Sequence, residues 1–98
     1  MENLLVINSL DNVGNAIEDI KAGQEAAYLM EQKKYVLKAK DDVPFGFKMA
    51  ICDIYKGQDI LKYGEPIGKA CKDIRKGQLV HVHNLEGKRG RGDAYQDQ

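Results

Sequence analysis

Apolar residues along this chain gather into short segments of strand length, separated by polar and turn-forming residues. Six segments are rich in β-branched, aromatic or other apolar residues: Leu4–Ile7, Ala26–Met30, Tyr35–Ala39, Lys48–Ile54, Asp59–Tyr63 and Leu79–His83. A helix needs an apolar stripe sustained over about ten residues or more, and only residues 15–27 come near one, where Gly23 interrupts it. The pattern predicts a small all-β domain with short irregular strands and at most one or two helical turns.

A hexapeptide, Asp-Ile-x-x-Gly-Gln, punctuates these segments at residues 19–24, 53–58 and 73–78. A weaker relative at residues 42–46 places Pro44 and Gly46 before another apolar run. Glycine takes a positive φ without a Cβ clash, and proline presets the φ of an early turn position. Because the copies are 34 and 20 residues apart, we interpret the hexapeptide as a recurring turn within one fold and not as a solenoid repeat.

The composition changes after Leu85, where residues 86–98 become polar and rich in glycine. Such sequence cannot bury enough surface to offset the entropy lost on ordering. We therefore predict a domain over residues 1–85 and a flexible polar tail over residues 86–98. An arm that orders on a partner chain is the alternative. A third interpretation is RNA binding through the tail cations Lys88, Arg89 and Arg91, and the lack of aromatic stacking partners argues against it.

Length and charge narrow the function classes. The 98 residues, 43% of them hydrophobic, suffice for one domain. Fifteen basic and fifteen acidic residues give no net charge, so no global field favours nucleic acid or an anionic membrane as a partner. Leu4–Ile7 is too short for a signal peptide or a membrane span, which predicts a cytoplasmic protein. Cys52 and Cys71 have no metal-site spacing, and we expect both to be small buried hydrophobes.

The strongest candidate for chemistry is the segment Leu79–His83. In a strand, Val80 and Val82 would enter the core while His81 and His83 project from the other face, with Cα atoms roughly 7 Å apart. Two imidazoles at that spacing can bind one metal ion or act as acid and base. The alternative is a pair of exposed histidines, because the motif lacks the further ligands that a metal site needs.

The second candidate is the segment 62–69, in which Gly64, Pro66 and Gly68 predict a tight rigid loop. Its backbone N–H groups could face an oxyanion, and Lys62 could add a positive charge for a carboxylate. The alternative is a hairpin connection with solvated lysines. Asp11 and its neighbour predict an Asx turn, and motifs of the common nucleotide, hydrolase and zinc-protease classes are missing from the sequence.

Four segments together resemble the SAF domain of the altronate/galactarate dehydratase family: Asp11-Asn12-Val13, Gly46–Ala50, Lys62–Gly68 and His81–Asn84. The resemblance covers residues 4 to about 85. It implies the β-clip fold, in a domain fused ahead of a larger catalytic domain or encoded as a separate small subunit. The sulfolactate sulfo-lyase small subunit is similar to the same pattern. The implied chemistry is elimination from a hydroxy acid, with loss of water or of sulfite.

The resemblance also implies roles for residues. We expect the small subunit of a metal-dependent hydro-lyase for sugar acids, inactive alone, which completes its active site with a large catalytic subunit. A divalent metal such as Fe²⁺ or Mn²⁺ would be shared with that subunit. The residues expected to take part are His81 and His83 as metal ligands and catalytic groups, Asn84 as a catalytic or orienting group, and Asp11, Asn12, Lys62, Tyr63 and Gly64 on the substrate side.

One departure from the family pattern lies at Gly46-Phe47-Lys48, where the pattern has glycine, histidine and lysine. If that histidine is functional, Phe47 favours a different substrate or a binding role. The alternative function is therefore a non-catalytic module that binds sugar acids or carbohydrates, as SAF-like domains do in other settings. An isolated subunit with an exposed docking face is also expected to form homo-oligomers.

Overall fold

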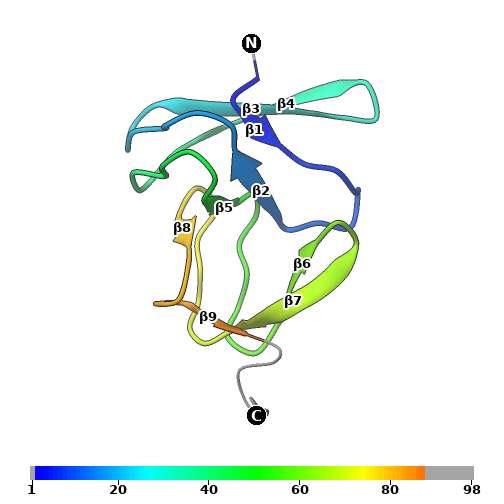
Figure 1. The fold of residues 1–98 in the computed structure, drawn as a ribbon, viewed down its shortest axis with the longest axis vertical. Helices are drawn as coiled ribbons and strands as arrows, with labels where there is room; N and C mark the ends of the chain where they lie inside the picture. Colours follow the sequence, from blue (N-terminus) through cyan, green and yellow to red (C-terminus); the bar gives the residue numbers. More distant parts are fainter. Residues whose placement is uncertain (1, 88–98) are drawn as a thin grey trace.

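A computed structural model describes residues 2–87, and this part of the chain contains nine strands and no helix (Figure 1). The strands are β1 (Leu4–Leu5), β2 (Val13–Ala16), β3 (Glu25–Met30), β4 (Lys33–Lys38), β5 (Lys48–Ala50), β6 (Asp59–Lys62), β7 (Glu65–Ala70), β8 (Leu79–Val80) and β9 (Leu85–Gly87). All paired strands are antiparallel. The prediction of a small all-β domain with short strands is confirmed.

The strands form three small sheets. A four-stranded sheet has the order β1-β2-β5-β8, β3 and β4 form a hairpin, and the third sheet has the order β6-β7-β9. In Figure 1 the four-stranded sheet lies between the hairpin above it and the third sheet below it. Each hairpin turns through two residues with positive φ, Glu31 and Gln32 in one, Tyr63 and Gly64 in the other, as expected for a turn that matches strand twist.

The four-stranded sheet contributes to a separate apolar core on each face, because successive side chains of a strand point to opposite sides. On one face Leu4, Ala16 and Met49 pack with residues of the β3–β4 hairpin. On the other, Val13 and Ala50 pack with residues of the third sheet. Four members of the second core are 0% exposed: Ala50, Ile60, Ile74 and Val80.

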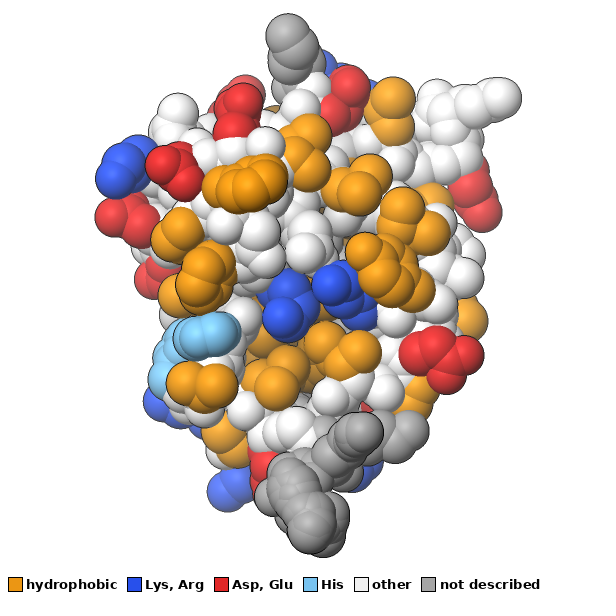
Figure 2. All heavy atoms as spheres, viewed as in Figure 1, with side chains coloured by type: hydrophobic (Ala, Val, Ile, Leu, Met, Phe, Trp, Pro, Cys, Tyr) orange, Lys and Arg blue, Asp and Glu red, His pale blue; other side chains and the backbone are white. Residues whose placement is uncertain are grey.

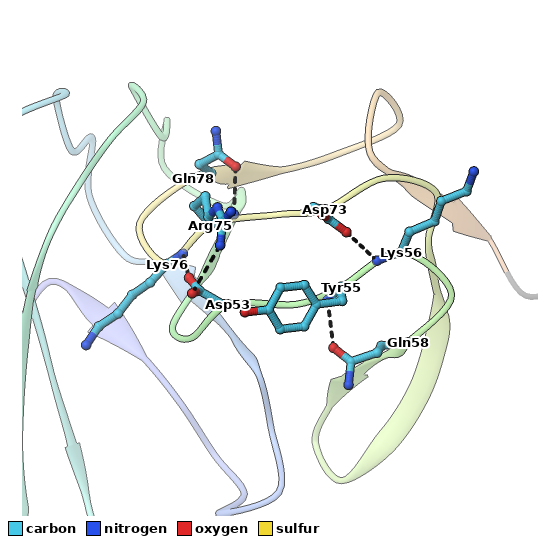
Figure 3. A network of polar contacts seen from close by, with 8 residues as sticks. All are labelled: Asp53, Tyr55, Lys56, Gln58, Asp73, Arg75, Lys76 and Gln78. Atoms are coloured by element: carbon cyan, nitrogen blue, oxygen red, sulfur yellow. Dashed lines mark hydrogen bonds and ion pairs between the residues drawn. The ribbon is translucent and has the colours of Figure 1, made fainter.

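The hexapeptides at 53–58 and 73–78 bind each other reciprocally (Figure 3). The Asp53 carboxylate accepts the backbone N–H of Lys76 at 2.9 Å, and the Asp73 carboxylate accepts that of Lys56 at 2.9 Å. Ile54 and Ile74 form an antiparallel bridge between the two turns. The predicted turn chemistry is confirmed, and each aspartate serves a turn distant in sequence.

The first hexapeptide pairs in the same way with its weaker relative at 42–46. The Asp19 carboxylate accepts the N–H of Phe45 at 2.9 Å, and the Asp42 carboxylate accepts the N–H of Ala22 at 2.8 Å. Ile20 bridges Val43 between them. The described chain therefore contains two clamps, each made of two turns, with one β-hairpin between the turns of each clamp.

Glycine and alanine complete every clamp. Gly57 and Gly77 have φ values of +91° and +94° and donate their N–H groups to the carbonyls of Ala70 and Ala50, both at 2.8 Å. Gly23 and Gly46 make the equivalent bonds to Ala39 and Ala16. An alanine stands three residues before the aspartate of every turn, a recurrence that extends the hexapeptide and that the turn pattern alone did not suggest.

Three strands were not predicted: β2, β7 and β9. Strand β2 ends at the start of the weak helical stripe of residues 15–27, and β7 occupies most of the segment predicted as a tight loop. Pro66 is tolerated in β7 because the register with β6 shifts next to its partner Leu61. Gly68 allows β9 to approach, since a Cβ there would lie 2.4 Å from the Glu86 carbonyl oxygen. Pairing on both sides outweighs the low strand propensity of this segment.

Strand β9 continues to Gly87, so Glu86 and Gly87 belong to the fold and not to the predicted tail. The remaining tail, 88–98, with its cations Lys88, Arg89 and Arg91, lies outside the described residues. Nowhere in residues 2–87 is there a helix long and apolar enough to cross a membrane. The expected burial of the cysteines was wrong: Cys52 and Cys71 are both free and exposed, because each lies on the surface stretch that leads into a turn.

Candidate functional site

The predicted strand through both histidines ends early. Strand β8 stops at Val80, which is 0% exposed, and residues 81–84 form a turn. The carbonyl of His81 accepts the N–H groups of Asn84 and Leu85 at 3.0 and 2.9 Å. Val82 is 77% exposed, so the prediction that it enters the core and aligns the imidazoles by strand alternation was wrong.

Asn84 holds this turn in place. It is 4% exposed, its side-chain NH₂ donates to the Leu79 carbonyl at 2.8 Å, and its side-chain oxygen accepts the N–H of His81 at 2.9 Å. Its own carbonyl accepts the N–H of Cys71 at 3.0 Å. Of the two roles expected for Asn84, the contacts correspond to orientation of the loop.

Both histidines are exposed on the turn. The His81 ring packs against the Phe47 ring with centroids 4.9 Å apart and planes tilted by 57°. Among residues 2–87 no three His, Cys, Asp or Glu side chains are grouped so that they could hold a metal ion. The described residues thus do not fit a metal centre by themselves, and a metal shared with a large subunit stays a prediction.

Asp11 has a structural environment. It is 8% exposed, and its carboxylate accepts the N–H groups of Tyr63 at 3.0 Å, Gly64 at 2.7 Å and Asn8 at 3.2 Å. Tyr63 has a φ of +58°, which is unfavourable for a residue with a side chain. The N–H groups that were expected to face an oxyanion of a substrate already bind a carboxylate of the same chain.

Asn12 ties β2 to the third sheet. Its side-chain oxygen accepts the N–H of Leu61 at 2.8 Å, and its NH₂ donates to the Asp59 carbonyl at 2.9 Å. Both polar ends of the side chain are bonded to backbone. Asp11 and Asn12 therefore position the β6–β7 hairpin, and the expected substrate-side function of Lys62, Tyr63 and Gly64 depends on that hairpin.

Two lysines, Lys48 and Lys62, lie together on one surface, which we call the lysine face. Lys48 on β5 pairs in register with Asn15 and Val80 and is half-buried, as is Lys62 on β6. Burial, and then the charge of Lys62, lower the pKa of Lys48. The Lys62 ammonium also lies 4.9 Å from the centre of the Tyr63 ring, a favourable cation–π contact.

Neither lysine has an ion pair with a carboxylate among residues 2–87. Figure 2 shows cationic side chains together in the middle of a hollowed face, with apolar groups around them and the histidines at its edge. Two partly desolvated like charges repel each other and are stabilised by an anion between them. Lys48 was not among the predicted site residues, although a lysine before the buried pair Met49 and Ala50 is a signal that could have found it.

A second hollow, of about 270 Å³, has a different character. The stacked rings of Tyr28 and Tyr35, with centroids 5.1 Å apart, line it together with Cys52. Although Cys52 is exposed as a residue, partial desolvation raises the pKa of its thiol, and burial raises the pKa of Tyr28. A thiol with a raised pKa stays protonated near neutral pH, so Cys52 is not an activated nucleophile.

Residues 2–88 match the altronate/galactarate dehydratase SAF domain. The chain belongs to this family. The SAF domain is 41% identical over 78 residues to altronate dehydratase of Escherichia coli K12, which covers 80% of this chain and 15% of that enzyme. Altronate dehydratase of Bacillus subtilis is 39% identical over 87 residues, 88% of this chain and 16% of the enzyme.

The SAF domain also matches (2R)-sulfolactate sulfo-lyase subunit alpha of Chromohalobacter salexigens, 37% identical over 75 residues. This alignment covers 74% of the chain and 80% of that subunit. The chain thus spans a small part of the altronate dehydratases but most of a sulfo-lyase alpha subunit. The resemblance inferred from the sequence is confirmed, and the relatives are lyases or lyase subunits.

Proposed function

We propose that this SAF domain is the small component of a lyase for sugar acids of the altronate or galactarate type, and that a large catalytic subunit completes the active site. Membership in the family supports the lyase assignment. The match to most of a sulfo-lyase alpha subunit supports a two-chain arrangement. The observation that carries the proposal is the pair of half-buried lysines, Lys48 and Lys62, without an ion-pair partner in residues 2–87.

A cationic pair suits the chemistry of such an elimination. The carbon next to the substrate carboxylate loses its proton to a base, and negative charge then spreads onto the carboxylate oxygens. On the neighbouring carbon the bond to the leaving hydroxyl breaks, and the hydroxyl departs as water once an acid has protonated it. Lys48 and Lys62 would bind the carboxylate and stabilise the charge that develops there.

The remaining catalytic groups are part of the proposal. His81 and His83 are exposed, and Figure 2 shows histidine side chains at the edge of the hollowed face. An acid or base from this chain could act there beside groups of the large subunit. Residues 2–87 do not build a metal site by themselves.

The proposal is tested by assaying the SAF domain alone, a large dehydratase subunit of the family alone, and the two together. Dehydration of altronate and galactarate should require both chains. Lys48→Gln should lower kcat/KM of the complex about 100-fold, as expected for loss of one group that stabilises developing charge. The matched control Lys21→Gln changes an exposed lysine far along the chain and should leave turnover unchanged. Full activity of the Lys48→Gln complex would exclude the lysine pair from catalysis.

One observation favours a second function. Phe47 stands where the family pattern has histidine and packs on His81, so that position carries no titratable group. This favours a non-catalytic module that binds sugar acids. Calorimetric titration of the isolated domain with altronate and galactarate discriminates: tight binding without turnover in the presence of the large subunit would establish the binding module instead.

A further inference from the structure

A basic groove of about 540 Å³ lies between the end of β4 and the turn that precedes β8. Four of its six lining residues are cationic and one is acidic. The lining consists of Leu37, Lys38, Lys40, Asp53, Arg75 and Lys76. In a chain whose formal charge is zero, this groove is a local concentration of positive charge.

Asp53 offsets only part of the charge of the groove, because its single negative charge faces four cations and pairs with Arg75. One carboxylate oxygen accepts the backbone N–H of Lys76 at 2.9 Å, and the other lies 3.5 Å from the Arg75 guanidinium. Both contacts are visible in Figure 3, where the Lys76 side chain extends away from the turn. The ammonium groups of Lys38, Lys40 and Lys76 have no ion pair within residues 2–87.

The two basic segments are held together by backbone contacts. The N–H of Lys40 donates to the Gly77 carbonyl at 2.8 Å. At Gly77 the two segments of the chain approach so closely that a Cβ would lie 2.3 Å from the Lys38 carbonyl oxygen. The Asp41 carboxylate accepts the N–H of Leu79 at 2.9 Å next to this contact. The cations therefore stand on a preformed surface and not on two independent loops.

The groove lacks the features of a phosphate site. Such sites present free backbone N–H groups to the anion, but the N–H groups of Lys40, Arg75, Lys76 and Gly77 are all bonded within the chain. Aromatic rings, which single-stranded nucleic acids use for stacking, are missing from the lining. An open row of exposed cations suits an extended acidic segment, which places several carboxylates along the groove.

We infer that this groove is a docking surface for an acidic segment of another polypeptide chain. It uses none of the residues of the lysine face, so it stands independently of the proposed lyase function. Electrostatic attraction would speed the association of the acidic segment with the groove. Salt would weaken the binding strongly, because the cations of the groove are exposed to solvent.

The test uses the full chain and a fluorescein-labelled oligo-glutamate peptide, with binding followed by fluorescence anisotropy at low and at high ionic strength. The triple variant Lys38→Gln, Lys40→Gln, Lys76→Gln leaves the Arg75–Asp53 contact intact and should bind about tenfold more weakly at low salt. The matched control replaces three exposed lysines outside the groove: Lys21→Gln, Lys33→Gln, Lys72→Gln. This control variant has the same net charge as the groove variant and should bind the peptide like the native chain.

Amide chemical-shift changes on titration should gather at the groove in the native chain. Three results would overturn the inference: no binding of the peptide at low salt, equal loss of affinity in both triple variants, or tighter groove-dependent binding of a single-stranded oligonucleotide of equal charge. The last result would assign the groove to nucleic acid, and the second would reduce it to non-specific attraction by net charge.

Discussion

The Asp11 carboxylate should be one of the most important polar groups for the stability of this domain. It is almost fully buried and accepts three backbone N–H bonds, of which the bonds from Tyr63 and Gly64 fix the tip of the β6–β7 hairpin. Asp11→Asn removes the charge and turns an NH₂ group toward backbone donors. Hydrogen bonds to a charged acceptor contribute about 1.5–3 kcal/mol each, so loss of one of them should cost about 1.5–3 kcal/mol.

A domain of this length has a stability on the order of 5–15 kcal/mol, so the loss would be a large fraction of the total. Urea unfolding followed by circular dichroism measures it, and thermal unfolding should show a midpoint lower by on the order of 10–20 °C. Asp59→Asn is the matched control, because this exposed carboxylate makes only a surface ion pair with Lys69 and should cost less than about 1 kcal/mol. If Asp11→Asn were no more destabilising than Asp59→Asn, Asp11 would not be a turn clamp, and its predicted contact with substrate would regain support.

Two further predictions concern stability. Gly77→Ala combines a positive φ with a Cβ 2.3 Å from the Lys38 carbonyl oxygen, whereas a Cβ at Gly57 meets open space. In urea unfolding, Gly57→Ala should lower the free energy of unfolding by about 1 kcal/mol, and Gly77→Ala should lower it clearly more. Equal losses in the two variants would contradict the close approach at Gly77. Partial burial of the Lys48 charge lowers the free energy of unfolding at pH values where the ammonium is protonated in both the folded and the unfolded chain. This penalty disappears as the pH rises from the lowered pKa of the folded chain toward the ordinary lysine pKa. The stability of Lys48→Gln relative to the native chain should therefore be higher at pH 7 than at high pH, as measured by urea midpoints. A relative stability that increases with pH would contradict the lowered pKa of Lys48.

The sequence predicts the turns and most strands well, because glycine and aspartate at fixed spacing have a local physical cause. Gly57 and Gly77 need positive φ, and Gln58 bonds its own turn at the N–H of Tyr55. What the pattern could not show is which turn each aspartate serves. Asp53 binds the N–H of Lys76, and such a partner is chosen by tertiary pairing and not by local sequence.

The candidate site was harder to predict for a related reason. Alternation along Leu79–His83 assumed that the strand continues, yet Asn84 bonds back to Leu79 and closes a turn that ends it. Lys62 was expected near a carboxylate-binding site and lies on the lysine face beside Lys48. Its neighbour there, Lys48, comes from a strand distant in sequence, so the pairing of the two charges follows from the fold alone.

Each clamp encloses a β-hairpin whose two ends are held by the same turns. In the first, the hairpin leaves after Gln24 and returns at Ala39, and the bonds between Gly23, Gln24 and Ala39 close its base. The second hairpin is closed in the same way at Gln58 and Ala70, but its tip is also anchored by Asp11. The β3–β4 tip at Glu31 and Gln32 is therefore the position where an insertion or a grafted sequence would disturb the rest of the molecule least.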